Sequence, residues 1–569
     1  MAPVMKKITE KYAIRWIVWL ASMAFAVFIC MTLGGMRQEA AEVLSFVGEK
    51  AEAEEKGLQI FVYSSDEYES RYALTPWFSK KDDKYFLFLP DWAFEISFSK
   101  DILFDGKTFA KGQKMTTEKT QFSFVCEERE YSVEIVQLAQ ISTLYMDTST
   151  GSLAYIGQSK ENKDVVEICA VDEQGKMTGQ AFGKINCRGN VTFEAPKKSY
   201  TLELAEDTDL YGMGEAKKWI LLANSFDSTS IRNYLSFYMA KQMNMYGTPE
   251  ARWVDVFANG EYQGIYLLCE KIEVDKERLD INDLEVQLEE NNNLEAVKKS
   301  NFYMISSDGQ KVIQKGFRLE YEPEDISGGY LLELESVPER YEEEKSGFIS
   351  DGGQQVVIKS PAYASPSQVK YISGLYQTME DALLQAGNTV TEDAFLEYAD
   401  LESFTKKYLI EEVSKNMDAS ASSLYLYKPE DDISTKLYAG PVWDYDRAYG
   451  NMGKLDDNLD LRTPDGMYVQ DGWYGTGFWS PFCWNPYFQE SVKKIYEEEM
   501  LPVIEECVNE KILQWEELIM PSAYADLMRW PDREEEVKEF QNLSYEEKVD
   551  RLINFLDARS LYLKEVWGV

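Results

Sequence analysis

Two aspartates that lie two residues apart are the first feature of the sequence able to do chemistry. Asp444 and Asp446 stand in GPVWDYDRAYGN, residues 440–451, directly after an apolar run. If that run continues as a strand, both carboxylates lie on one face and repel each other unless a cation lies between them. Arg447 would then point to the opposite face, so we expect a metal ion to neutralise the pair.

A third aspartate follows a predicted helix. Asp418 stands in YLIEEVSKNMDASASSLYLYKPE, residues 408–430, at the mouth of a loop of small residues that leads into a short strand. Such an aspartate can act as a general base or metal ligand, or it can simply cap the helix or a turn. The later Asp444 favours chemistry, because kinase-like folds place a catalytic acid on a loop and a magnesium ligand on the next strand.

Cationic side chains gather in KINCRGNVTFEAPKKSYTLEL, residues 184–204. Arg188 and Asn190 flank a glycine, and Lys197 and Lys198 follow the turn into a predicted strand. Alternation along that strand directs Lys198 to the interior or to a cleft, where it needs an anionic partner, and directs Lys197 to water. A basic turn without a ligand is the alternative.

Two further elements carry polar residues in apolar surroundings. Arg232 and Asn233 interrupt an apolar helix in DSTSIRNYLSFYMAKQM. These two residues either form a solvated face of the helix or have a binding role. Glu270 follows a buried strand of a hairpin that turns at Asn259-Gly260, so it stands at a strand-to-linker corner or in a salt-bridged strand end.

Composition excludes several classes of function. Among 569 residues, 99 are acidic and 59 basic, and the net charge of −40 repels a phosphate backbone, so we expect no nucleic-acid partner. The sequence contains no histidine, which excludes Ser-His-Asp and Cys-His hydrolases and His-ligated zinc. The seven cysteines form no CxxC pair, so neither a zinc site nor a disulfide framework is indicated.

The N-terminal residues predict a membrane anchor. Residues 16–33 form an unbroken uncharged run of membrane-spanning length, and lysines and an arginine precede it. Basic residues stay in the cytoplasm, so the main body after residue 36 is expected outside the cell membrane as a single-pass protein. A cleaved signal peptide is the alternative, although its cleavage site would be poor.

Composition and periodicity divide the chain into four parts. After the cytoplasmic N-terminus and anchor (1–36) and a stalk (37–56), residues 57–141 alternate like the strands of a small β-sandwich, which we interpret as a spacer. Residues 142–569 are mixed α/β and become mostly helical toward the end, with a closing amphipathic helix over 546–567. Polar, charge-rich segments at 283–327 and 339–355 are expected to be surface insertions.

Five ordered motifs carry a family resemblance. RGNVTFEAPKKSYTLEL, LYGMGEAKKWILLAN with SIRN, NGEYQGIYLLCEKI, NMD and GPVWDYDRAYGN resemble the spore coat protein H (CotH) kinase family over about residues 140–565, here as a membrane-anchored bacterial type. The resemblance implies an α+β, atypical protein-kinase-like fold of two lobes, a small lobe over about 142–375 and a helical lobe over about 376–569.

The resemblance also implies roles for individual residues. ATP would bind with Mg²⁺ or Mn²⁺, and the implied sites are catalytic Asp418 and Asp444, metal-binding Asp444 and Asp446, and nucleotide-binding Arg188, Asn190, Lys197, Lys198 and Glu270. In protein kinases an Asn five residues after the catalytic Asp usually holds a second metal ion. Here that position is Ser423, a weaker ligand, so we expect chemistry with one metal ion.

Three functions follow from these residues. The first is transfer of the ATP γ-phosphate to Ser or Thr of an unknown protein acceptor at the cell surface. Because ATP is scarce outside cells, the alternative is a non-catalytic surface or envelope-binding module that retains the kinase-like fold and binds through exposed aromatic residues. The third is a glycosidase that uses Asp418 and Asp444 as its two carboxylates. In such an enzyme Lys197 and Lys198 would have no function.

Overall fold

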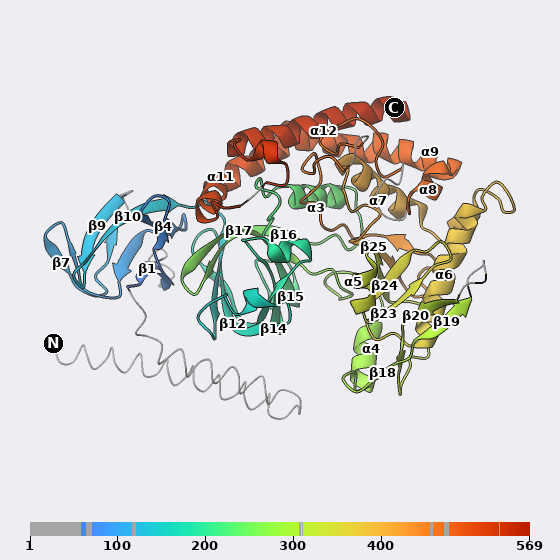
Figure 1. Ribbon diagram of the computed structural model, residues 1–569, viewed down its shortest axis with the longest axis horizontal. Coiled ribbons are helices and arrows are strands. Elements are labelled where there is room, and N and C mark those ends of the chain that lie inside the picture. The colour runs from blue at the N-terminus through green and yellow to red at the C-terminus, as the bar shows by residue number, and fades with distance from the viewer. Residues whose placement is uncertain are drawn as a thin grey trace.

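The structure in Figure 1 is a computed structural model that describes residues 58–63, 71–116, 121–305, 309, 311–455, 459–470, 477–533 and 535–569. It contains mixed helices and sheets with a small β-rich region near the N-terminus. The predicted anchor and stalk lie outside the described residues. Within the described residues, no helix is both long and apolar enough to span a bilayer.

The β-rich region consists of two sheets that enclose one core, as the alternating pattern of residues 57–141 predicts. One sheet has the strand order β2-β1-β5-β8 and the other β3-β4-β10-β9-β6-β7. The strands are β1 Ile60–Tyr63, β2 Arg71–Leu74, β3 Trp77–Ser79, β4 Lys84–Leu89, β5 Glu95–Phe98, β6 Ile102–Phe104, β7 Lys107–Phe109, β8 Met115–Thr116, β9 Gln121–Cys126 and β10 Arg129–Gln137.

A closed seven-stranded barrel follows, in the order β11-β12-β13-β14-β15-β17-β16. Its strands are β11 Ser142–Thr148, β12 Lys163–Val171, β13 Met177–Arg188, β14 Ser199–Asp209, β15 Glu215–Leu222, β16 Ala251–Ala258 and β17 Glu261–Glu270. The predicted hairpin at Asn259-Gly260 is confirmed, with positive φ angles of 52° and 86°. Helix α3 (Arg232–Gln242) lies between β15 and β16.

The β-rich region and the barrel share one hydrophobic core, so the prediction of a spacer is wrong. Tyr72 stacks on Tyr145 of the barrel with ring centroids 4.2 Å apart, and Phe88 lies 4.6 Å from Tyr262. In Figure 1 the barrel stands between the blue β-rich region and the yellow-green strands and helix of residues 330–384. The region is therefore an integral part of the structure around the barrel.

The C-terminal half, here residues 330–569, combines a five-stranded sheet with most of the helices. The sheet order is β23-β24-β22-β25-β26, from β22 Tyr330–Glu335, β23 Ser346–Ile349, β24 Gln355–Ser360, β25 Leu424–Lys428 and β26 Tyr438–Ala439. The helices are α6 Pro366–Leu384, α7 Leu401–Ser414, α8 Ser480–Trp484, α9 Pro486–Ile495, α10 Leu501–Glu506, α11 Ile512–Arg529 and α12 Tyr545–Trp567. The expected closing helix is confirmed as α12, which begins with a capping box of Ser544 and Glu547.

The two polar segments differ from each other. Residues 283–327 form helix α4 (Leu284–Asn291) and the short strands β18 Lys298–Lys299, β19 Phe302–Ile305, β20 Lys311–Gln314 and β21 Phe317–Arg318. Residues 339–355 contain helix α5 (Pro338–Glu343) and sheet strand β23, so the prediction of a surface insertion there is wrong. The expected lobe boundary near 375 falls inside the continuous helix α6.

Candidate functional site

A polar cleft of about 720 Å³ opens between the barrel and the C-terminal half. The barrel contributes the turn after β13 and the loop after β15, at residues 186–192 and 222–226. The C-terminal half contributes residues 333–344, the loop between α7 and β25, and the loop after β26. The cleft is therefore lined by segments far apart in the sequence.

Asp418, Asp444 and Asp446 all line this cleft. Asp418 lies on the loop after α7, as predicted, and Asp446 is buried while the other two are half-buried. The predicted strand through Asp444 and Asp446 is wrong, because β26 ends at Ala439 and the chain turns at Asp444 with a φ of 70°. A loop, not strand alternation, brings these two carboxylates to the same cleft.

Burial is the main cause that raises the pKa of each of these carboxylates. The pKa of Asp418 rises to about 7, and the charge of Asp444 adds to the effect. Burial raises the pKa of Asp444 against the opposing charge of Arg188, and burial together with Asp444 holds the pKa of Asp446 well above its usual range. A cation between these groups would relieve their repulsion.

Cationic side chains line the same cleft, and Arg447 is one of them. The expectation that Arg447 points away from the acids is wrong, because no strand is present and its charge lowers the pKa of Asp418, Asp444 and Asp446. Its guanidinium also forms a 3.0 Å ion pair with Glu536 and lies 4.3 Å from the ring centroid of Phe226.

Arg188 is held at the cleft by Trp443, with 5.2 Å between the guanidinium and the ring centroid. Its Nη1 atom is buried and has no hydrogen-bond partner among the described residues. Asn190, also predicted, lines the cleft and accepts a hydrogen bond of 3.2 Å from Lys160. An unsatisfied buried guanidinium is suited to an anionic ligand such as a phosphate.

The other three predicted nucleotide-binding residues do not line the cleft. Lys197 was expected to face water but is buried, with a 2.7 Å ion pair to Asp526 on α11. Lys198 donates a hydrogen bond to the carbonyl of Phe193. The expected alternation does not apply to either lysine, because β14 begins only at Ser199.

Glu270 is buried at the end of β17, where it accepts a 2.7 Å hydrogen bond from the backbone of Glu250. Burial raises the pKa of Glu270 to about 7. This carboxyl group stands at the strand end, but it accepts from a backbone amide there instead of forming the salt bridge that the structural alternative predicts, and it does not line the cleft.

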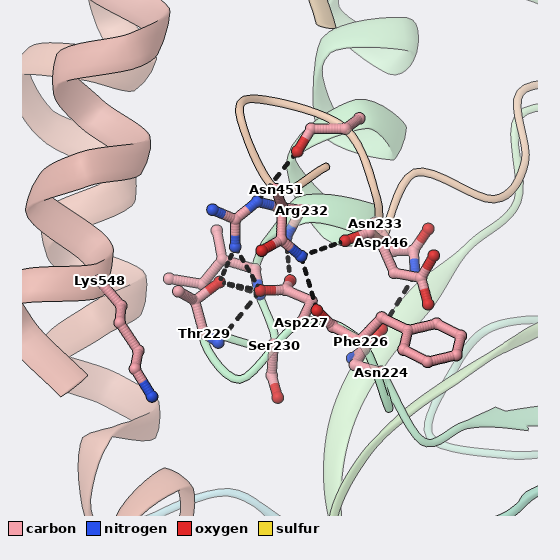
Figure 2. Close-up of polar contacts among 12 residues, drawn as sticks. Asn224, Phe226, Asp227, Thr229, Ser230, Arg232, Asn233, Asp446, Asn451 and Lys548 are labelled. Carbon is pink, nitrogen blue, oxygen red and sulfur yellow. Dashed lines mark hydrogen bonds and ion pairs between the residues drawn. The ribbon is translucent and has the colours of Figure 1, made fainter. Parts of the chain in front are cut away.

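A buried network of polar contacts supports the loop that carries Asp446 (Figure 2). Asp227 accepts a 2.9 Å hydrogen bond from the backbone of Arg232 and pairs with its guanidinium, whose Nε donates to the carbonyl of Ala448 at 3.1 Å. Asn451 donates 2.6 Å hydrogen bonds to the carbonyls of Asp446 and Phe226. Arg232 is thus a buried support of the site, not part of a solvated helix face.

Asn233, which follows Arg232 on α3, connects this helix to the loop that carries Asp444 and Asp446. Its side-chain oxygen accepts a 2.7 Å hydrogen bond from the backbone of Tyr445, between Asp444 and Asp446. Ser423, which stands where the second metal ligand is expected, donates a 3.3 Å hydrogen bond to Asp444. Both contacts fix the loop, and Ser423 orients a carboxylate.

Sequence reasoning missed several charged residues of the cleft, among them Arg340, Lys359, Glu333 and Glu335. Lys359 lies 3.3 Å from Glu333, and Arg340 lies 3.9 Å from Glu335. The alternation of apolar and charged residues in YLLELE, residues 330–335, is a signal that could have found the two glutamates.

The described residues contain no cluster of three or more Cys, Asp or Glu side chains arranged to hold a metal ion alone. Asp444 and Asp446 nevertheless fit Mg²⁺ as a pair, because this ion is commonly bound by one or two carboxylates together with phosphate oxygens and water. Their raised pKa values and the unsatisfied Nη1 of Arg188 fit a cation and a phosphate in the same cleft.

Comparison with protein families matches residues 185–563, more than half of the chain, to the family described as CotH kinase protein. The chain belongs to the CotH kinase family. The matched residues begin within β13 of the barrel and end within α12, so they include every segment that lines the cleft except Lys160. No curated protein matches this CotH family member significantly.

Proposed function

We propose that this CotH family member is an atypical protein kinase with a two-lobed, kinase-like arrangement around the cleft. It transfers the γ-phosphate of ATP to Ser or Thr of a protein acceptor. The observation that carries this proposal is the convergence of Asp418, Asp444 and Asp446 with the unsatisfied guanidinium of Arg188 in one cleft.

Each group has a separate task in this proposal. Asp418 accepts the proton of the acceptor hydroxyl, whose oxygen bonds to the γ-phosphorus while the bond to the β–γ bridging oxygen breaks and ADP leaves. A pKa raised to about 7 suits a base that works near neutral pH. Asp444 and Asp446 would hold Mg²⁺ or Mn²⁺, which supplies positive charge to the phosphates, and Arg188 and Asn190 contact the phosphate oxygens.

Phosphate transfer and nucleotide binding test the proposal separately. The protein is incubated with γ-labelled ATP and Mg²⁺ or Mn²⁺, beside Asp418→Asn and Asp444→Asn variants. We expect label on the wild type alone, Mg²⁺-dependent ATP binding in Asp418→Asn, and loss of that binding in Asp444→Asn. Binding without transfer by the wild type would instead indicate the non-catalytic module.

The cell-surface location is part of the same proposal. It is supported by the uncharged run at 16–33 and the basic residues before it, which lie outside the described residues. We expect the full chain to fractionate with membranes and to be digested by protease added to intact cells. Recovery in the soluble fraction after removal of residues 1–36, but not before, is the matched control.

A further inference from the structure

Two aromatic side chains hold the backbone on either side of Asp418. The hydroxyl of Tyr468 donates a 2.7 Å hydrogen bond to the carbonyl of Met417, and the indole nitrogen of Trp479 donates one of 2.9 Å to the carbonyl of Ala419. Tyr468 is 3% exposed and Trp479 is fully buried. The carbonyls before and after Asp418 are thus fixed by two buried donors.

The segment that carries Tyr468 is itself anchored to α7 and α12. Glu412 of α7 accepts a 2.7 Å hydrogen bond from the backbone of Tyr468 and forms a 2.8 Å ion pair with Arg559 of α12. Arg559 and Lys415 also donate to backbone carbonyls within residues 463–466. Glu412, Arg559 and Lys415 are all buried, where the loss of a polar partner is costly, so these contacts hold the segment in place.

The loop with Asp418 needs such support because its own geometry is unfavourable. It begins at Lys415 and ends at Ser423, which have positive φ angles of 47° and 55°, a region that non-glycine residues seldom adopt. Asp418 and Asp444 also line the same cleft, and two carboxylates close together repel each other unless a cation lies between them. Contacts from outside the loop must resist both effects.

We propose that Tyr468 and Trp479 are positioning residues that hold Asp418 at the cleft through the carbonyls of its two neighbours. This role rests on the proposed function, in which Asp418 accepts the proton of the acceptor hydroxyl. Neither aromatic residue lines the cleft, so their effect falls on the rate of transfer and not on ATP binding.

The test is Tyr468→Phe, which removes one hydroxyl and keeps the ring. We expect kcat to fall about five- to tenfold, as for one lost buried hydrogen bond, while KM for ATP stays within about twofold. Hydrogen exchange of the amides of residues 416–422 becomes faster. Trp479→Phe, checked for folding by its melting temperature, gives the same combination.

Tyr211→Phe is the matched control. The Tyr211 hydroxyl is also buried and donates a 2.7 Å hydrogen bond to a backbone carbonyl, that of Thr143 in the barrel, and Tyr211 does not line the cleft. We expect this variant to leave both kcat and the exchange of residues 416–422 at wild-type values.

Hydrogen exchange and catalysis distinguish failure of the positioning role from failure of the proposed function. Unchanged exchange of residues 416–422 in both Tyr468→Phe and Trp479→Phe overturns the positioning role, and so does faster exchange with an unchanged kcat. A wild-type protein that binds ATP but transfers no phosphate refutes the proposed function, and the exchange rates then decide whether the two residues hold the loop.

Discussion

At the scale of single residues, neighbouring lysines of this protein have very different surroundings. Lys197 is buried against Asp526, which also pairs with Arg533, whereas Lys198 is half-buried and donates to a backbone carbonyl. We predict that Lys197→Ala lowers the free energy of unfolding by about 3 kcal/mol, because a buried carboxylate loses a partner. Lys198→Ala serves as the control and changes it by less than about 1 kcal/mol. Both are measured by urea unfolding.

Arg188 offers a second prediction at this scale. Because its Nη1 has no partner among the described residues, Arg188→Ala removes a donor that is free to bind a ligand. We expect Mg²⁺-dependent ATP binding to weaken at least about tenfold in calorimetry, with Arg188→Lys in between. Lys198→Ala should bind ATP like the wild type. Equal losses in Arg188→Ala and Lys198→Ala would contradict the assignment of the cleft.

Residues at the ends of elements were easier to place from the sequence than residues within an assumed strand. Asp418 follows the end of a predicted helix, and the position of that helix end does not depend on strand alternation. Lys197, Lys198 and the pair at 444–446 were placed by strand alternation, which fails because β14 begins later and β26 ends earlier than the pattern suggests. Long-range pairs such as Lys197 with Asp526 leave no local signal.

At the scale of elements, a buried polar cluster joins helix α11 to the barrel. Asp255 of β16 accepts 2.7 Å hydrogen bonds from Tyr262 and from Ser522 of α11. Burial raises the pKa of Asp255 to about 7, so the folded protein binds this proton more tightly than the unfolded chain does. The stability it contributes is present below about pH 4 and is lost as the pH rises through 7.

We therefore predict that the melting temperature falls between pH 5.5 and pH 8, and that it falls less in Asp255→Asn. An amide cannot ionise, so the variant loses this part of the pH dependence. The exposed Asp432 provides the control, since Asp432→Asn should follow the wild-type curve. If the melting temperatures of the wild type and Asp255→Asn change in parallel with pH, the packing of α11 on the barrel does not depend on this proton and the prediction is wrong.

Strands that carry charged residues were the elements hardest to predict from the sequence. Residues 339–355 looked like a solvated insertion because of their acidic residues, yet they provide α5 and β23. The neighbouring strand β22 carries Leu331, Leu332 and Leu334 into the core, while its Glu333 and Glu335 line the cleft. A strand that borders a polar cleft is charged on one side, and composition alone does not distinguish it from a loop.

At the scale of the whole molecule, the β-rich region completes the surface of the barrel. Tyr145, Phe257 and Tyr262 of the barrel belong to the same core as that region. We predict that a protein beginning at Ala139 exposes these rings and aggregates, whereas one beginning at residue 37 is monomeric in size-exclusion chromatography. A soluble and equally stable shorter protein would mean that the shared core is dispensable.

The contact between α11 and the barrel also has a consequence for biosynthesis. Asp255 and its partner Ser522 are separated by 267 residues, so the ribosome releases the barrel strands well before the helix that covers their polar cluster. At ordinary rates of translation the delay is on the order of tens of seconds. During that interval the nascent barrel carries a carboxylate and a lysine without their helical partners, and it reaches its final state only when synthesis is almost complete.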